Sequence, residues 1–221
     1  MMSTGKRAAV VLLLLALGLC ASVALAAPGD PQKKYTKAGQ AQARTVALRR
    51  ADFPAGWIQK PKQKQSNSSN PRCSYYNPDQ SDLVEIGEYD SPDFDLPDGS
   101  SVSSSTGVFR TVAMARSGYA RVAQPSLPKC LAELFTKGAK PSKTTIFSAA
   151  PIQFPRYGDR SNAYRITASV KTPTARIRVV LDVVLFNRGP IDVAVLTLGI
   201  GHPLPAELEQ SLVAKVAARS Q

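Results

Sequence analysis

Apolar residues recur every three or four positions in several stretches of the chain, which is the spacing of an amphipathic helix. In the last of these stretches Leu208, Leu212 and Val216 fall on one helical face, and Pro205 stands at its start. The first stretch ends where Pro54 prevents a helix from continuing. We therefore predict helices over residues 36–52, 111–123, 125–137 and 205–219.

Runs of alternating or continuously apolar residues indicate strands. Val179, Leu181 and Val183 alternate with residues that are themselves mostly apolar, so we expect this strand at the centre of a sheet, covered on both faces. The turn Arg188-Gly189-Pro190 predicts a hairpin. The predicted strands are 83–89, 101–109, 144–154, 163–171, 175–187 and 191–198. Both patterns together predict an α+β fold, an antiparallel sheet of about four to six strands packed with about three helices.

Residues 1–26 have the organisation of a removable secretory signal peptide. Lys6 and Arg7 precede an apolar run over 8–21, and Ala24-Leu25-Ala26 supplies the small residues that a signal peptidase requires. The apolar run is shorter than the roughly 20 residues that span a bilayer, which disfavours an uncleaved membrane anchor. We therefore predict a secreted, extracytoplasmic protein without a transmembrane segment after the signal is removed.

The expected mature chain begins at residue 27. Acylation at Cys20 is disfavoured, because Leu19 occupies the position where a lipoprotein signal carries a small residue. Residues 27–35 contain Pro, Gly and Lys with little to bury, and we predict a flexible leader there. The remaining residues, 36–221, are enough for one hydrophobic core and are predicted to form a single α+β binding domain.

Signal cleavage would leave two cysteines, Cys73 and Cys130, in an oxidising compartment. A bridge between them closes a loop of roughly sixty residues, for which the chain-entropy model gives about 4 kcal/mol of stabilisation. The alternative is a pair of free thiols. A redox function is not expected, because the sequence has no C-x-x-C pair.

The chain is strongly basic. It has 28 Lys and Arg against 16 Asp and Glu, a net charge of +12 that falls to +10 without Lys6 and Arg7. Half of the acidic residues lie between Asp79 and Asp98, so the rest of the chain is more positive still. This balance favours an envelope lipid, a glycan or an anionic polymer as partner. Nucleic acid is not expected, because the chain is predicted to be exported and lacks aromatic residues interleaved on a strand face.

Two sets of residues are candidates for binding. Trp57 and Phe53 follow the first helix and could line the rim of a ligand pocket, although a lone Trp in this position is more often a core residue. The basic residues near the N-terminus could bind an anionic surface, the alternative being a solvated face that aids solubility. These basic residues are Lys33, Lys34, Lys37, Arg49, Arg50, Lys60, Lys62 and Lys64.

The acidic segment also provides candidate calcium ligands, Asp90, Asp93, Asp95 and Asp98. Calcium binds closely spaced hard oxygens of this kind outside cells. The spacing does not match an EF-hand loop, and the alternative is an acidic loop that is solvated or packs on the basic body of the domain. No cofactor is expected, because the sequence contains neither a glycine-rich phosphate loop nor a dinucleotide-binding motif.

The single histidine, His202, lies between the last predicted strand and the last helix. A serine hydrolase would need this side chain beside a nucleophile and an acid, but no serine occupies a G-x-S-x-G elbow. We therefore expect no enzymatic activity, and keep an extracellular hydrolase using His202 with a serine as the alternative. A solvated or capping histidine is the simpler interpretation.

Three parts of the chain resemble a group of exported actinobacterial proteins related to the extracellular sensor domains of serine/threonine kinases and to envelope lipoproteins. The residues that carry the resemblance are 51–57 (ADFPAGW), 113–116 with 128–131, and 184–189 with 214–219. The resemblance implies an antiparallel sheet packed with helices that binds ligands at the envelope, often with two disulfides. It therefore implies a non-enzymatic, sensor-like domain that holds a hydrophobic or anionic ligand between helices and sheet.

Overall fold

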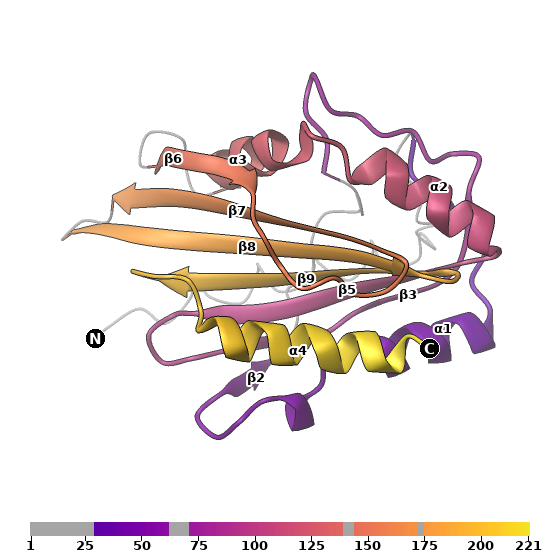
Figure 1. The fold of residues 1–221 in the computed structure, drawn as a ribbon, viewed down its shortest axis with the longest axis horizontal. Helices are drawn as coiled ribbons and strands as arrows, with labels where there is room; N and C mark the ends of the chain where they lie inside the picture. Colours follow the sequence, from indigo (N-terminus) through magenta and orange to yellow (C-terminus); the bar gives the residue numbers. More distant parts are fainter. Residues whose placement is uncertain (1–28, 62–70, 139–143, 172–174) are drawn as a thin grey trace, which may run out of the picture.

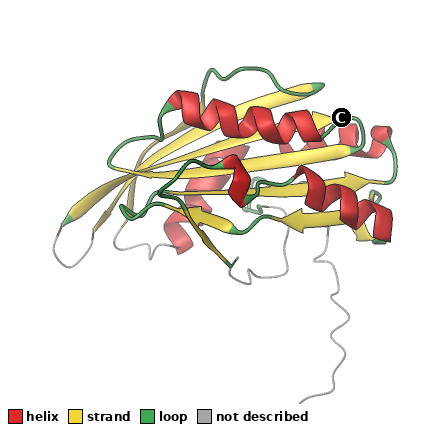
Figure 2. Ribbon diagram, turned by 90° about the horizontal axis from the view of Figure 1, so that it is seen from below, coloured by secondary structure: helices red, strands yellow, loops and turns green. Residues whose placement is uncertain are grey.

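A nine-stranded sheet runs through the molecule, and helices cover both of its faces (Figure 1 and Figure 2). The computed structural model describes residues 29–61, 71–138, 144–171 and 175–221. The strands are β1 (Gln32–Lys33), β2 (Ile58–Lys60), β3 (Val84–Asp90), β4 (Asp93–Asp95), β5 (Ser101–Phe109), β6 (Thr144–Pro151), β7 (Arg160–Lys171), β8 (Arg176–Arg188) and β9 (Ile191–Ile200). The helices are α1 (Lys37–Val46), α2 (Val112–Val122), α3 (Leu127–Gly138) and α4 (Ala206–Arg219), with a 3-10 turn at Arg50–Asp52.

The strand order is β1-β3-β5-β9-β8-β7-β6, with β2 and β4 paired beside the start of β5. Strands β6 to β9 follow one another as antiparallel neighbours, and β8 lies inside the sheet as its apolar pattern predicts. Strand β9 then pairs along β5, from Ser101 opposite Leu198 to Val108 opposite Ile191. The only parallel pair among the described strands is β1 with β3.

Helices α1 and α4 cover one face of the sheet, which we call the α1/α4 face. Thr36 caps α1 by accepting a hydrogen bond from the backbone N–H of Gly39 at 3.0 Å, and the helix buries Ala43 and Val46. Val184 and Phe186 of β8 pack into the same core, together with Leu212 of α4. The other face, the α2/α3 face, buries Ala115, Tyr119, Leu127, Tyr164 and Val183.

A disulfide fixes the α2/α3 face to the segment before β3. Cys73 and Cys130 are bonded with their Cα atoms 5.7 Å apart, and both are buried, which confirms the predicted pairing. Close to this bridge, the Tyr76 hydroxyl donates a hydrogen bond to the carbonyl of Val122 at 2.7 Å. The segment at 73–76, which has little regular structure, is therefore held against both helices of this face.

Helix α1 approaches β3 so closely that neither backbone has room for a side chain at the contact. A Cβ atom on Gly39 would lie 2.2 Å from the carbonyl oxygen of Ile86, and a Cβ on Gly87 would lie 2.2 Å from the carbonyl group of Gly39. Real Cβ atoms do not approach other atoms to such distances. Two glycines are therefore required where the first helix crosses the sheet.

The α+β class is confirmed, while the element count differs from the prediction. The sheet has nine strands rather than about four to six, because β1, β2 and β4 are two or three residues long and have no periodic pattern. Four helices form rather than about three. Gln32–Lys33, expected in a flexible leader, pairs with β3. Among the described residues, no helix has the length and apolar content needed to cross a membrane.

Candidate ligand-binding grooves

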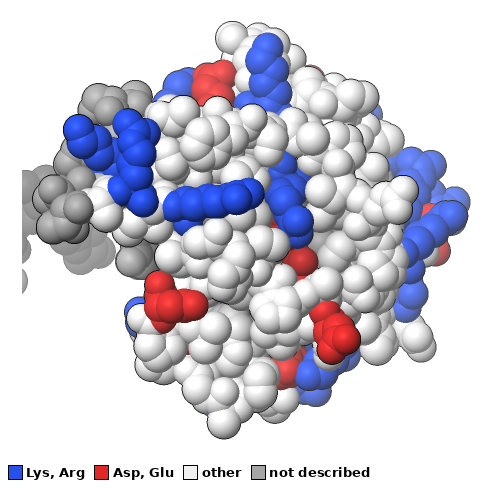
Figure 3. Space-filling view, turned by 60° about the vertical axis from the view of Figure 1, so that its left-hand side comes forward, with Lys and Arg blue, Asp and Glu red and all other residues white. Residues whose placement is uncertain are grey.

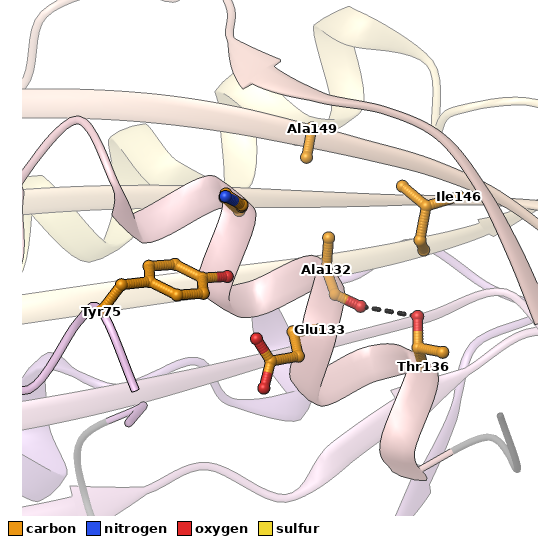
Figure 4. Close-up of a pocket in the computed structure, with 7 residues that line it drawn as sticks. Tyr75, Ala132, Glu133, Thr136, Ile146 and Ala149 are labelled. Atoms are coloured by element: carbon orange, nitrogen blue, oxygen red, sulfur yellow. Dashed lines mark hydrogen bonds between the residues drawn. The ribbon is translucent and has the colours of Figure 1, made fainter. Parts of the chain in front are cut away.

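The first groove on the α2/α3 face lies between α3 and the edge strand β6. Its volume is about 450 Å³, and it opens to solvent. Figure 4 shows Tyr75 and Glu133 at one side of α3, and Ile146 and Ala149 across from the helix on β6. The lining residues are Tyr75, Lys129, Ala132, Glu133, Thr136, Ile146 and Ala149.

The polar groups of this α3–β6 groove interact mainly with one another. The ammonium of Lys129 lies 4.6 Å from the centre of the Tyr75 ring, as a cation–π pair. Glu133 accepts from Lys137 at 2.5 Å, and the Thr136 hydroxyl donates to the carbonyl of Ala132 at 2.9 Å. The groove therefore offers mostly carbon atoms to a ligand.

The second groove lies between α2 and the start of β7, and its volume is about 480 Å³. One arginine, Arg156, comes from the loop before β7, and the other, Arg160, is the first residue of β7, while residues of α2 line the opposite wall. None of the described residues that line this α2–β7 groove is acidic. They are Tyr119, Ala120, Ala123, Arg156, Arg160, Ser161 and Asn162.

Hydrogen bonds organise the wall of the α2–β7 groove. The Tyr119 hydroxyl donates to Oδ1 of Asn162 at 2.7 Å, and burial raises the pKa of Tyr119, which keeps the phenol protonated at neutral pH. The guanidinium of Arg156 donates to the carbonyl of Asp159 at 2.5 Å, and that of Arg160 to the carbonyl of Arg116 at 3.4 Å. Each guanidinium has five N–H donors, so most donors of both arginines remain for a ligand.

Two carboxyl groups on the α2/α3 face have raised pKa values. Glu85 of β3 is 6% exposed, and its Oε1 lies where a side chain on Gly107 would stand. Burial, reinforced by the neighbouring charge of Glu88, raises the pKa of Glu85 to about 8. Asp192 lies opposite Gly107 on β9, and burial raises its pKa to about 8 against the opposing effect of its hydrogen bond from Asn187.

Another carboxyl with a raised pKa lies on the opposite side of the sheet. Glu209 of α4 accepts a hydrogen bond from Thr197 at 3.1 Å, and burial raises its pKa to about 7. Nearby, Arg165 binds both oxygens of Asp182 at 2.6 Å, and Asp182 is 1% exposed. These polar groups interact with one another beneath α4.

Trp57 and Phe53 belong to the core. Both are buried, and the Phe53 ring stacks on Phe94 with 4.2 Å between centroids and lies 5.1 Å from the Trp57 ring. Neither residue lines either groove. Their placement favours the core alternative over the predicted pocket rim.

The basic residues predicted to bind an anionic surface are partly neutralised in the structure. Lys33 pairs with Glu88 at 2.7 Å and Lys60 with Asp95 at 2.7 Å. Arg49 approaches Asp52 at 3.9 Å, and Arg50 donates to the carbonyl of Phe53. Their role in binding stays a prediction. The same holds for Lys34 and Lys37, while Lys62 and Lys64 lie outside the described residues.

The four predicted calcium ligands are spread along β3, β4 and the turn that follows. Asp95 binds Lys60, and Asp98 accepts a hydrogen bond from the backbone N–H of Ser100 at 2.8 Å. Asp90 and Asp93 lie at the end of β3 and the start of β4. In the described part of the chain, no group of three or more His, Cys, Asp or Glu side chains is arranged to hold a metal ion.

Among the described residues, the ring of His202 makes a hydrogen bond only within its own loop. Its Nδ1 lies 2.9 Å from the carbonyl oxygen of Pro203, and the side chain is exposed. Neither a serine nor a carboxylate is within hydrogen-bond distance of the ring in this part of the structure. The contact agrees with a solvated histidine at a strand–helix junction.

Sequence reasoning did not identify Arg156 and Arg160 as site residues. They lie four positions apart at the start of β7 and in the loop before it, where no motif distinguishes them from other basic residues. Only the packing of α2 against this part of the sheet places Tyr119 and Ala123 beside them. The sole sequence signal is their proximity to the polar pair Ser161-Asn162.

No family model matches the chain, and no curated protein matches it. Among solved structures, the chain is similar to LpqN, which is described as involved in cell envelope biogenesis of Mycobacterium tuberculosis. The two chains are 8% identical, with a TM-score of 0.34, over 76% of this chain and 78% of LpqN. At this TM-score the likeness supports no conclusion about fold or function.

Proposed function

We propose that this protein is a non-enzymatic, extracytoplasmic binding domain of the cell envelope that holds a small anionic ligand in the α2–β7 groove. The observation that carries the proposal is the pair Arg156 and Arg160 in a groove of about 480 Å³ whose described lining contains no acidic residue. Guanidinium groups bind carboxylate and phosphate oxygens through paired hydrogen bonds. The ligand is therefore a small molecule with a carboxylate or phosphate group.

Neighbouring side chains supply further donors. Because Tyr119 donates to Oδ1 of Asn162, the amide nitrogen of Asn162 remains to donate to a ligand oxygen. Ser161 adds a hydroxyl, while Ala120 and Ala123 provide a small apolar wall. A few polar groups beside an apolar wall is the usual composition of a small-molecule site. The α3–β6 groove is the weaker site for an anion, because Glu133 lines it.

The alternative function, an extracellular hydrolase based on His202, has less support. Its histidine lacks a described serine or acid partner, and both grooves lie on the opposite side of the sheet from α4, which His202 precedes. Replacing His202 by Ala should leave ligand binding unchanged. Loss of a hydrolytic activity in a folded His202→Ala variant would favour the hydrolase instead.

The proposal is tested by native mass spectrometry of the protein purified from its secreting host, followed by isothermal titration. The titration uses inorganic pyrophosphate and, separately, succinate as anionic probes. We expect a co-purifying anion and binding of at least one probe. The variant Arg156→Gln/Arg160→Gln should lose binding, while Arg176→Gln/Arg178→Gln, which removes the same charge elsewhere, should retain it. A bare protein that binds neither probe, or equal loss in both variants, would contradict the proposal.

A further inference from the structure

Strands β6, β7 and β8 contain many more basic than acidic residues. Their described residues include six basic side chains and a single acid, Asp182. Asp182 is buried and paired with Arg165, so it does not neutralise the other basic groups. The basic residues are Arg160, Arg165, Lys171, Arg176, Arg178 and Arg188.

Three of these basic residues gather at one end of the β7–β8 hairpin. Lys171 lies directly opposite Arg176, and Arg178 lies opposite Ser169. Because side chains alternate along strands, all three cations share the face on which Arg165 meets Asp182, which is the α1/α4 face. All three are exposed. Figure 3, which brings this end of the molecule forward, shows Lys and Arg side chains in several groups on this face, with Asp and Glu side chains at a few other places.

Contacts among the described residues leave the positive charge of this region uncompensated. Among the described residues, Arg176 donates one hydrogen bond, to the uncharged hydroxyl of Ser169 at 3.4 Å. No described acidic side chain pairs with Lys171 or Arg178. The region differs in this respect from the N-terminal basic residues, where Lys33 and Lys60 each bind a carboxylate.

An exposed aromatic residue lies on the neighbouring edge strand. Phe147 of β6 is 63% exposed, more than any other large hydrophobic residue in the described chain. The register of β6 against β7 shifts between Ile146 and Ser148, so Phe147 is the additional residue of a β-bulge. Ile146 and Ala149 line the α3–β6 groove, but Phe147 does not. The bulge therefore leaves a large apolar side chain in solvent at the edge of the sheet.

We propose that this end of the sheet, the hairpin patch of Phe147, Lys171, Arg176 and Arg178, docks on the surface of an anionic lipid bilayer. Clustered cations are attracted to anionic head groups, and an exposed aromatic side chain is stabilised by entering the interface. Either feature alone also occurs on proteins that do not bind membranes. Their combination at the same end of β6, β7 and β8, without neutralising acids among the described residues, fits a bilayer better than a soluble polyanion, which would leave Phe147 in water.

Vesicle co-sedimentation of the mature chain tests the proposal. The vesicles contain phosphatidylcholine mixed with phosphatidylglycerol, and pure phosphatidylcholine is the reference. We expect salt-sensitive binding to the anionic vesicles only. Each cation near an anionic surface contributes about fivefold to partitioning, so Arg176→Gln/Arg178→Gln should weaken binding about 30-fold. Phe147→Ser should weaken it about tenfold, because the side chain no longer enters the interface.

A matched variant separates the patch from net charge. Arg156→Gln/Arg160→Gln removes the same charge from the α2–β7 groove and should leave vesicle binding nearly unchanged. Equal loss in both double variants would overturn the proposal in favour of unspecific attraction. Unchanged binding by folded Phe147→Ser would overturn it in favour of a polyanion contact. The residues differ from those of the anion groove, so failure of one proposal leaves the other standing.

Discussion

Arg219 of α4 binds both carboxylate oxygens of Asp52, with its Nη1 2.9 Å from Oδ1 and its Nη2 2.8 Å from Oδ2. The same guanidinium donates to the carbonyls of Val46 and Ala47 at the end of α1. Burial opposes ionisation of Asp52, but the hydrogen bonds from Arg219 and from the backbone of Arg49 hold its pKa below the usual value. The last helix is thereby fixed to the exit of the first.

We expect Asp52→Asn to lower the free energy of unfolding by about 3 kcal/mol, because it leaves the guanidinium of Arg219 buried without its charge partner. Asp82→Asn is the matched control, since Asp82 pairs with Arg121 on the surface, and it should change stability little. Urea unfolding at neutral pH measures both. Equal effects would mean that the Asp52 pair contributes no more than a surface pair.

Protonation of Asp52 in acid should also lower the free energy of unfolding, because it removes the ion pair with Arg219. A carboxyl whose pKa is lowered by folding stabilises the protein above its unfolded value of 3.8, and this contribution disappears as pH falls through the folded pKa. We therefore expect the stability difference between wild type and Asp52→Asn to shrink as pH is lowered below about 4. A constant difference down to acid pH would contradict the ionised pair.

Glu85 should produce the opposite pH dependence. The pKa of Glu85 rises from 4.5 to about 8 on folding, so the folded state holds the proton more tightly than the unfolded state. The free energy of unfolding is therefore highest with respect to this group below pH 4.5, and it falls as pH rises towards about 8. Since one pKa unit corresponds to about 1.4 kcal/mol, Glu85→Gln should stabilise the protein at pH 8 by at least about 2 kcal/mol relative to its effect at pH 5. Thermal unfolding at the two pH values measures this difference.

The control for Glu85 is Glu133→Gln. The hydrogen bond from Lys137 lowers the pKa of Glu133, so this carboxyl is ionised in both folded and unfolded chains above about pH 5. Its replacement should therefore leave the change in stability between pH 5 and pH 8 as it is in the wild type. If Glu85→Gln behaves in the same way, the buried carboxyl is not responsible for the pH dependence.

Removal of the disulfide should destabilise the protein. The bridge closes a loop of 57 positions between Cys73 and Cys130, and the chain-entropy model gives about 4 kcal/mol for a loop of this length. We expect Cys73→Ala/Cys130→Ala to lose about that amount in urea unfolding under oxidising conditions. Treatment with a reductant should destabilise the wild type but not the variant. Equal stability of both proteins without reductant would show that the bridge contributes nothing.

Gly39→Ala should destabilise the fold although alanine has the higher helix propensity. The new methyl group would meet the carbonyl oxygen of Ile86, and overpacking of this kind costs about 1–3 kcal/mol. Gln42→Ala, on an exposed position of the same helix, should change stability little. Thermal unfolding of the two variants compares them. A stabilised Gly39→Ala protein would mean that α1 can move away from β3 at little cost.

The long elements could be predicted from the sequence, and the short ones could not. Strand β5 covers the predicted range 101–109, and all four helices form within the predicted segments to within a residue or two, except that α1 ends at Val46 before a separate 3-10 turn. Strands β1 and β4 pair with the longer strands β3 and β5, and β2 pairs with β4, and local periodicity does not reveal such tertiary pairings. The paired cysteines were predictable because Cys20 falls in the predicted signal peptide, which leaves one possible pairing.

For the candidate site, the sequence predicts the kind of ligand but not the residues that bind it. An anionic partner follows from the charge, but the groove depends on α2 lying over the start of β7, a contact between residues about forty positions apart in the chain. Phe53 and Trp57, for which the sequence left a pocket rim and a core position open, show the same dependence on tertiary packing. An aromatic pair beside a helix exit has the composition of a pocket rim, and only the position of Phe94 in the folded sheet shows that both rings are core residues.

The pairing of β9 with β5 has a consequence for the order in which the sheet forms. The two strands are central in the sheet, yet Ser101 and Leu198 are separated by nearly the whole second half of the sequence. The sheet therefore cannot close until the residues of β9 are available, and a central contact between such distant residues slows folding. The two halves of the sheet thus join late, when almost the whole chain can take part.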